Sequence, residues 1–362
     1  MQIIQDRRAL HQIPELGLEL PKTQKYVLKS LSGLNCQVVT PAGCAVCAFF
    51  DFGADSAIAF RADMDALPIQ EISDKPYVST HPGQMHACGH DGHTAILLEF
   101  ARRLSNKKKL PHNILLIFQP AEEPTQGAVQ ICEVGVLEQY RVKAVFGLHL
   151  WPMLEKGKVF TRKNELMAKA CEVDIEITGR SAHIGKASEG LDALDAGMQI
   201  YTRARDLEKA LPAEEYRILN FGFFQSGTVR NAISAKTVLQ GSLRSYRPEI
   251  HDYLQTGLER IIREVCEATG CAAKVHITKG SPAVMNPPEL VDAVSRLLPV
   301  ELLPEPSLTA EDFSEYQQRV PGVFFFLGLG ENPALHSTNF DFDESVLEKG
   351  ADFFEELAEK YQ

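Results

Sequence analysis

The chain has 362 residues, of which 44% are hydrophobic and 23% are charged, so it can bury a large core and is long enough for two domains. Its 37 Lys and Arg residues stand against 48 Asp and Glu residues, and the formal net charge of −11 is spread without long blocks. This balance argues against nucleic acid or an anionic membrane surface as a partner.

Two further features bear on the compartment. Residues 1–8 lack the apolar core of a signal peptide, and no apolar run approaches the ~18 residues that span a bilayer. The eight cysteines are irregularly spaced and too sparse for a disulfide framework. Cys44 and Cys47 have CxxC spacing, but they lie in a strand-like run where positions three apart point to opposite faces. We therefore expect a cytoplasmic protein with reduced, mostly buried thiols.

The first half of the chain alternates apolar strands with helices. The predicted elements are helices within 1–32 interrupted at 13–17, strands at 46–52 and 57–61, a helix from 94, a strand at 113–119, a helix near 128–138 and a strand at 144–150. This order predicts an α/β fold with a mixed, mostly parallel sheet covered by helices. In such sheets, ligands collect beyond the carboxyl ends of the strands.

From about residue 170 the pattern changes to alternating polar and apolar positions. It predicts a strand at 171–178, a helix at 191–209, strands at 218–224 and 237–243, a helix at 250–268 and a strand at 272–278. The order β-α-β-β-α-β is that of a small ferredoxin-like α+β unit. Because the α/β pattern returns after Pro282, we expect a catalytic domain in two parts, 1–168 and 281–362, interrupted by a lid and dimerisation domain at 169–280.

The densest group of chemically active side chains lies at 85–93, where a loop turns into a predicted helix. It contains His86, Cys88, His90, Asp91 and His93. Thiolate, imidazole and carboxylate groups suit a borderline divalent cation such as zinc. The alternative is a polar surface loop that happens to be rich in histidine, but the density of the group favours a metal site.

One loop cannot close a metal site, and further donors follow other predicted strands. The candidate ligands are Cys88, His90, Glu123, His149 and His336. Five donors exceed the four of a closed structural zinc site, so either the site holds two ions or some ligands are misassigned. A water between two ions, acidified to a pKa near ~7, would be a hydroxide nucleophile at neutral pH.

The residues beside these ligands suggest catalysis. Glu122 adjoins Glu123 at a strand end and could act as general acid and base on the metal-bound water, although adjacent carboxylates can also form a simple acidic turn. Asp63 is expected to accept a hydrogen bond that orients a ligand imidazole, while Asp65 could be structural. His86 and His93 could be ligands, but each could equally be a hydrogen-bond donor next to them.

The motifs taken together resemble the metal-dependent amidohydrolases related to aminoacylases and carboxypeptidases. Within that group they are most similar to the branch of N-acyl-amino-acid amidohydrolases and hippurate hydrolases. The resemblance covers nearly the full chain and rests on the segments 7–17, 61–68, 86–93, 119–123, 148–149, 179–183 and 309–313.

The resemblance implies roles for individual residues. It makes Cys88, His90, Glu123, His149 and His336 the ligands of a binuclear centre with Cys88 bridging, and it makes Glu122 the catalytic acid and base. It also implies that His183 of the lid helps hold the substrate carbonyl or the oxyanion, often from a partner subunit. Asn231 and Arg244 resemble substrate-contacting residues, with Arg230 and Arg247 as competing clamps for a carboxylate. From the sequence alone, His183 could lie in a surface loop and Arg244 in a salt bridge.

We therefore expect a hydrolase that cleaves the amide bond of small N-acyl amino acids with two divalent ions per chain (zinc, manganese, cobalt or nickel), working as a homodimer through the lid. Among members of the branch, the chain looks most similar to N-acetyldiaminopimelate deacetylases of lysine biosynthesis. One alternative is a dipeptidase or carboxypeptidase on the same scaffold. Another is a non-catalytic metal-binding protein, against which the presence of Glu122 counts.

Overall fold

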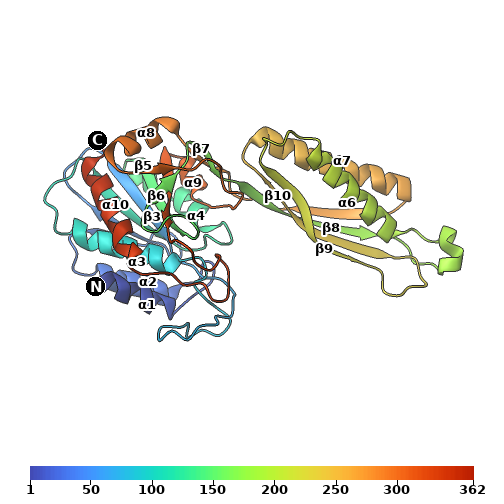
Figure 1. The fold of residues 1–362 in the computed structure, drawn as a ribbon, viewed down its shortest axis with the longest axis horizontal. Helices are drawn as coiled ribbons and strands as arrows, with labels where there is room; N and C mark the ends of the chain where they lie inside the picture. The colour runs from blue at the N-terminus through green and yellow to red at the C-terminus, as the bar shows by residue number, and fades with distance from the viewer. The chain divides into compact units, whose positions relative to one another are not determined.

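The structure is a computed structural model that describes residues 1–362, and the chain forms two compact units (Figure 1). The larger unit comprises Met1–Leu166, Val284–Pro306 and Glu311–Gln362. The smaller unit comprises Met167–Ala283 and Ser307–Ala310. The sequence pattern did not indicate the short return of 307–310 to the smaller unit.

The larger unit is built on a mixed eight-stranded sheet in the order β1-β2-β4-β3-β5-β14-β6-β13. Its strands are β1 (Gln37–Val39), β2 (Val46–Phe50), β3 (Ala57–Asp63), β4 (Asn113–Gln119), β5 (Val142–Trp151), β6 (Val159–Thr161), β13 (Glu301–Leu302) and β14 (Gly322–Gly328). The central strands β4, β3, β5 and β14 are parallel to one another, and antiparallel pairs lie at β1/β2, β2/β4 and β6/β14. Every residue of β3, β4 and β14 is buried, as expected for strands covered on both faces. The predicted α/β class is confirmed.

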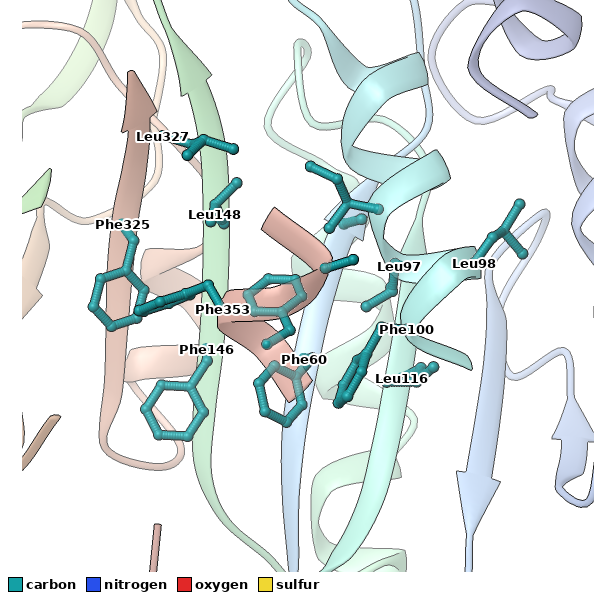
Figure 2. Packing of buried hydrophobic residues seen from close by; sticks show 14 of the residues in the cluster. Phe60, Leu97, Leu98, Phe100, Leu116, Phe146, Leu148, Phe325, Leu327 and Phe353 are labelled. Carbon is teal, nitrogen blue, oxygen red and sulfur yellow. The ribbon is translucent and has the colours of Figure 1, made fainter. Parts of the chain in front are cut away.

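Helices cover this sheet. They are α1 (Gln2–His11), α2 (Pro21–Leu31), α3 (His90–Leu104), α4 (Gly127–Glu133), α5 (Val136–Gln139), α8 (Pro288–Leu297), α9 (Ser314–Gln317) and α10 (Val346–Lys360). One face carries an aromatic core in which Phe60 of β3 packs edge-on against Phe100 of α3, with ring centroids 4.9 Å apart (Figure 2). Phe325 of β14 meets Phe353 of α10 at the same distance of 4.9 Å. This packing fixes α3, and with it the loop that precedes α3, over the parallel strands.

The interruption between the first two helices has a structural reason. The Glu15 carboxylate accepts hydrogen bonds from the backbone N–H groups of Lys22 (3.0 Å) and Thr23 (2.9 Å) in the first turn of α2. These donors have no partner within the helix, so a carboxylate from the preceding turn caps α2. Pro21 at the first helical position adds a residue whose backbone angle suits a helix start.

The smaller unit has the predicted ferredoxin-like order. Its elements are β8 (Lys169–Thr178), the 3-10 helix η1 (Ile184–Glu189), α6 (Ala193–Lys209), β9 (Arg217–Ser226), β10 (Lys236–Ser245), α7 (Pro248–Thr269) and β11 (Ala272–Ile277). The antiparallel sheet has the order β11-β8-β10-β9. A separate core that includes Ile175, Ile200, Leu239 and Leu258 holds the two helices on the sheet.

A small two-stranded sheet of β7 (Asn164–Met167) and β12 (Val284–Asn286) completes the strands.

Two local predictions were wrong. The single helix expected at 128–138 is divided into α4 and α5, because Gly135 takes a positive φ of 74° between them. Cys44 lies before β2, outside any strand, where its sulfur accepts a hydrogen bond from the Leu20 backbone N–H (3.3 Å). All eight cysteines are free. None of the helices combines the length and the apolar character needed to cross a membrane.

Candidate metal centre

The carboxyl ends of the parallel strands bring polar side chains to one face of the large sheet. Side chains alternate along a strand, so Arg61 and Asp63 of β3 point away from the face that carries Phe60. Asp63 pairs in register with Gln119 at the end of β4, and β5 delivers His149 on the same side. Because these strands are parallel, their ends meet at one edge of the sheet.

The loop before α3 completes this edge. Gly89 precedes the helix with a φ of 86°, a conformation that favours glycine. Gly92 in the first turn has no room for a side chain, because an added Cβ would lie 2.6 Å from Leu150 and 2.9 Å from Phe342. The two glycines let the segment with Cys88 and His90 pack directly against β5. Both of these side chains are buried.

The structure brings the five predicted ligands together as two triads that share one thiol. Donor atoms of Cys88, His90 and His149 lie within 4.8 Å of one another, and so do those of Cys88, Glu123 and His336. In the first triad, Cys88 Sγ is 3.4 Å from His149 Nε2. In the second, His336 Nε2 is 3.4 Å from Glu123 Oε1. Cys88 Sγ is the one donor atom that these two triads share.

Backbone carbonyls fix the orientation of two of the imidazoles. His90 Nδ1 lies 2.8 Å from the Asp65 carbonyl oxygen, and His149 Nδ1 lies 2.7 Å from that of Leu150. A carbonyl only accepts hydrogen bonds, so Nδ1 carries a proton in both rings, and in the neutral ring Nε2 is the nitrogen whose lone pair can bind a metal ion. Such an outer hydrogen bond is the usual way in which a ligand histidine is oriented.

The two other histidines of the loop have different surroundings. His93 donates from Nδ1 to Asp63 Oδ1 (2.6 Å), and its Nε2 accepts the backbone N–H of Leu150 (2.8 Å). Both of its nitrogens are therefore occupied. His86 is buried and belongs to neither triad, and burial lowers its pKa to about 3, so its ring is neutral.

The structure shows which imidazole Asp63 contacts. It accepts a hydrogen bond from His93, and its Oδ2 is 3.7 Å from His90 Nε2, so its role in orienting a ligand imidazole stays a prediction. The residue that holds the site together is Asp65. Its carboxylate accepts the backbone N–H groups of Glu122 (2.9 Å) and Glu123 (3.1 Å), and its carbonyl holds His90. The sequence signal was a second carboxylate two positions beyond a buried strand end.

Glu122 and Glu123 lie on a strained turn. Ala121 before them has a φ of 55°, an uncommon value for a residue with a side chain. The turn closes through hydrogen bonds from the backbone N–H of Thr125 to the Glu122 carbonyl (2.7 Å) and from that of Gly127 to the Ala121 carbonyl (3.0 Å). Glu122 is buried, and its Oε2 lies 4.0 Å from His90 Nε2. The carboxyl is thus held beside the two triads.

A buried charge cluster that sequence reasoning missed lies next to Glu122. Arg61 donates to Asp63 (2.7 Å), Glu311 (2.8 Å) and Asp312 (2.8 Å). Carboxylate oxygens of Glu311, Asp312 and Glu122 lie within 4.8 Å of one another. Burial raises the pKa of Glu311 to about 8 and that of Asp312 to about 6, although Arg61 lowers both. Burial and the neighbouring carboxylates also raise the pKa of Glu122 well above its ordinary value.

The three remaining predicted site residues belong to the smaller unit. His183 and Asn231 are neighbours on its surface, where the backbone N–H of Ile184 donates to the Asn231 carbonyl (2.9 Å) and His183 pairs with Ala232. Arg244 lies near the far end of β10 and donates to the Leu308 carbonyl (2.8 Å). With β10 rising ~3.3 Å per residue, Arg244 is about 26 Å from the end that carries Asn231. His183 and Asn231 therefore lie near one end of the smaller unit, and Arg244 lies near the other.

The donor set fits a divalent metal. His90 Nε2 and Glu123 Oε1 are buried and make no hydrogen bond, although such atoms are normally paired in a folded protein. The thiol, imidazole and carboxylate donors match the ligand preferences of zinc and its neighbours. Half of the His336 side chain is exposed, so the site is open on that side, as a catalytic centre requires.

An α/β unit with this donor set at its strand ends, interrupted by a ferredoxin-like unit, defines a metal-dependent hydrolase. Residues 59–360 match the sequence model of the family described as Peptidase family M20/M25/M40. The chain belongs to that family and is one of its hydrolases.

Comparison with individual proteins agrees with this family. An uncharacterized hydrolase of Staphylococcus haemolyticus is 34% identical over 99% of this chain and 98% of its own length. The crystal structure of the YXEP protein of Bacillus subtilis, described as a dinuclear metal binding peptidase from the M20 family, has a TM-score of 0.85 and 31% identity over 99% of this chain and 96% of that one. An aminobenzoyl-glutamate utilization protein from Klebsiella pneumoniae shares the fold, with a TM-score of 0.70 at 21% identity over 99% of this chain and 95% of that one.

Proposed function

We propose that the chain hydrolyses the amide bond of small N-acyl amino acids at a centre of two divalent ions. The observation that carries this proposal is the pair of triads that share Cys88, with the buried Glu122 beside them. Cys88 is assigned as the bridging ligand, His90 and His149 complete one triad, and Glu123 and His336 complete the other. The description of the Bacillus subtilis neighbour as dinuclear supports this assignment.

Divalent ions bound there supply Lewis acidity, which acidifies a water and polarises an acyl carbonyl. The chain's own residues handle the proton. Glu122 takes the proton of the attacking water and later gives it to the leaving amine. Asp65 fixes the backbone of Glu122 and Glu123 together, so the proton-transfer group and a ligand keep a constant separation. Zinc, manganese, cobalt and nickel are the candidate native metals.

The smaller unit supports a homodimer. The proposed carbonyl-binding His183 and the proposed carboxylate clamp Arg244 are separated by about 26 Å of strand, too far for one small substrate to touch both in a single chain. In a dimer, Arg244 of one chain and His183 of the other could meet at the same site, so each chain would supply one residue. The edge strand β9 exposes Phe223 and Phe224, and the Phe224 ring lies against Gly197 of α6, next to the exposed Met198, which gives such a dimer an apolar contact.

The dimer has a direct test. Sedimentation of the wild-type chain should give the mass of two chains, and Phe224→Asp should shift it towards one, because a charge at an apolar contact is left unpaired. A wild-type chain that sediments as a monomer at all concentrations contradicts the dimer.

A cytoplasmic, reducing location is also proposed, since all eight cysteines are free.

The experiment that tests the proposed function is amine release from a panel of substrates. The panel contains N-acetyl and N-benzoyl amino acids, N-acetyl-diaminopimelate and dipeptides, each with protein loaded with zinc, manganese or cobalt. We expect metal-dependent turnover of an N-acyl class, reduced by about 10²- to 10⁴-fold in Glu122→Gln at unchanged metal content. Preferential cleavage of dipeptides would instead favour the peptidase activity named for the Bacillus subtilis neighbour.

A further inference from the structure

A second buried charge cluster centres on Arg7 of α1. It includes Asp91, which follows the loop that carries Cys88 and the first helical residue His90. The Arg7 side chain is completely buried, and a buried guanidinium is unfavourable unless carboxylates surround it. Three carboxylates do so. Arg7 Nε lies 2.8 Å from Asp91 as an ion pair without hydrogen-bond alignment, Nη2 lies 2.8 Å from Asp341, and Nη1 lies 3.3 Å from Glu344.

Aromatic rings enclose the same guanidinium. Its central carbon lies 4.6 Å from the centre of the Phe342 ring and 4.9 Å from that of Tyr77. Tyr77 in turn donates to Asp341 (3.0 Å). Phe342 is buried and approaches Gly92, where an added Cβ would lie 2.9 Å from its ring. These contacts leave the guanidinium little freedom to move.

The carboxylates around Arg7 come from the two segments that carry proposed ligands. Asp91 follows His90 directly in the first turn of α3. Asp341 and Glu344 follow His336 by five and eight positions. The backbone N–H of His336 also donates to the Ala87 carbonyl (2.8 Å), so the two segments already meet beside the triads. The ion pairs of Arg7 join the same two segments a second time.

His11 reinforces the same cluster. It lies one helical turn after Arg7 on α1, and its Nδ1 is 2.8 Å from Asp91 Oδ2, the oxygen that also faces Arg7. Its Nε2 is 3.3 Å from Glu71. Two adjacent turns of α1 therefore hold one carboxylate beside the ligand His90. A helix that only covered the core would not need this convergence.

We propose that Arg7 is a positioning residue for the metal centre. It holds the segment of His336 against the loop of Cys88 and His90, so that the triads that share Cys88 stay at binding distance. The proposal rests on the ligand assignment made above, but it concerns residues that touch neither the ligands' donor atoms nor a substrate.

The chain offers a matched control. Arg102 also joins α3 to α1, through an ion pair with the buried Asp6. It lies eleven positions after Asp91 on α3, about 16 Å away at ~1.5 Å per residue. Arg102→Met should therefore loosen α1 without reaching the ligand segments, whereas Arg7→Met releases them.

The first measurement is metal affinity by competition with a chromophoric chelator, without substrate. Removing an outer-shell partner of a metal site typically lowers affinity 10- to 100-fold, so we expect about that loss in Arg7→Met and wild-type affinity in Arg102→Met. Asp341→Asn, which changes a partly exposed residue, covers the case in which Arg7→Met does not fold, and it should lower affinity by about 3- to 10-fold, less than the loss of a complete partner. Wild-type affinity in Arg7→Met, or an equal loss in Arg102→Met, would overturn the proposal.

The second measurement is hydrogen exchange of the metal-free protein, which does not depend on the ligand assignment. Arg7→Met should speed exchange at 336–347 and 86–92, with the His336 amide as the most direct reporter, while Arg102→Met should leave these segments unchanged. Equal exchange in both variants would refute the positioning role. If the wild type bound no metal at all, the proposed function would fail, while the exchange comparison would still decide the role of Arg7.

Discussion

Asp65 offers the sharpest test of how the site is held. Its carboxylate accepts the backbone N–H groups of Glu122 at 2.9 Å and Glu123 at 3.1 Å. In Asp65→Asn, one oxygen becomes an NH₂ group that faces a backbone N–H, and the other oxygen loses its charge. A hydrogen bond to a charged group contributes about 1.5–3 kcal/mol and a neutral one about 1 kcal/mol, so losing the first and weakening the second removes about 2–5 kcal/mol.

This loss of free energy should be visible in catalysis. The turn that Asp65 holds carries both Glu122, the proposed proton-transfer group, and Glu123, a proposed ligand. At about 1.4 kcal/mol per tenfold change in rate, about 2–5 kcal/mol corresponds to a loss of about 30- to 4,000-fold in kcat/KM. The assay is kcat/KM on the best substrate of the panel, with metal content and thermal unfolding measured in parallel.

A matched control uses the same substitution elsewhere. Asp51→Asn also weakens a carboxylate hydrogen bond, to the backbone N–H of Gly53 (2.8 Å), but Asp51 is exposed and follows β2 at the opposite edge of the sheet. It should change the free energy of unfolding by less than about 0.5 kcal/mol and leave kcat/KM unchanged. If Asp65→Asn stayed within threefold of the wild type, the turn would not depend on this carboxylate and the reasoning would be refuted.

Three further predictions follow from buried carboxylates. Glu311→Gln keeps an oxygen that can accept hydrogen bonds from Arg61 and from the Phe313 backbone N–H, so it should fold like the wild type. Glu311→Ala leaves that buried N–H unpaired. Denaturant titrations of this variant should show a free energy of unfolding lower by about 1–3 kcal/mol. Because burial raises the pKa of Glu311 from 4.5 to about 8, the native state keeps a proton that the unfolded chain has released between these values. The stability of the metal-free protein should therefore fall as pH rises through that window, and a melting temperature that falls equally in Glu311→Gln would contradict this origin. Glu15→Ala removes the cap of α2 and should lower the free energy of unfolding by about 1–2 kcal/mol at unchanged kcat, and a change in kcat would show that α2 acts on the site.

The large features could be predicted because they follow from local periodicity. Strongly apolar runs such as 113–119 predicted buried parallel strands, and the change in pattern near residue 170 predicted a ferredoxin-like unit. Four of the ligands could be proposed from their places in the chain: Cys88 and His90 stand at the start of α3, Glu123 follows β4, and His149 lies near the end of β5. His336 lies in a loop after β14 and had no such local signal. The break between α4 and α5 was missed because an isolated glycine within a helical pattern is often tolerated.

The supporting residues could not be predicted, because their contacts join segments far apart in the chain. Asp63 ends β3 and Asp65 follows two positions later, and the sequence does not say which of the two carboxylates meets the backbone of Glu122. The sequence left His93 open as a ligand. In the structure, both of its ring nitrogens make hydrogen bonds, one to Asp63 and one to the Leu150 backbone. Arg7 is hundreds of positions from Asp341, and no spacing rule connects them.

The central claim is that two triads sharing Cys88 hold two ions that serve a reaction driven by Glu122. The most direct measurement is the number of metal equivalents bound per chain, together with turnover, in the wild type, Cys88→Ala and Glu122→Gln. The account predicts two equivalents in the wild type, loss of tight binding at both positions in Cys88→Ala, and two equivalents in Glu122→Gln with turnover reduced by about 10²- to 10⁴-fold. A single equivalent in the wild type, two tight equivalents in Cys88→Ala, or wild-type turnover in Glu122→Gln would contradict it.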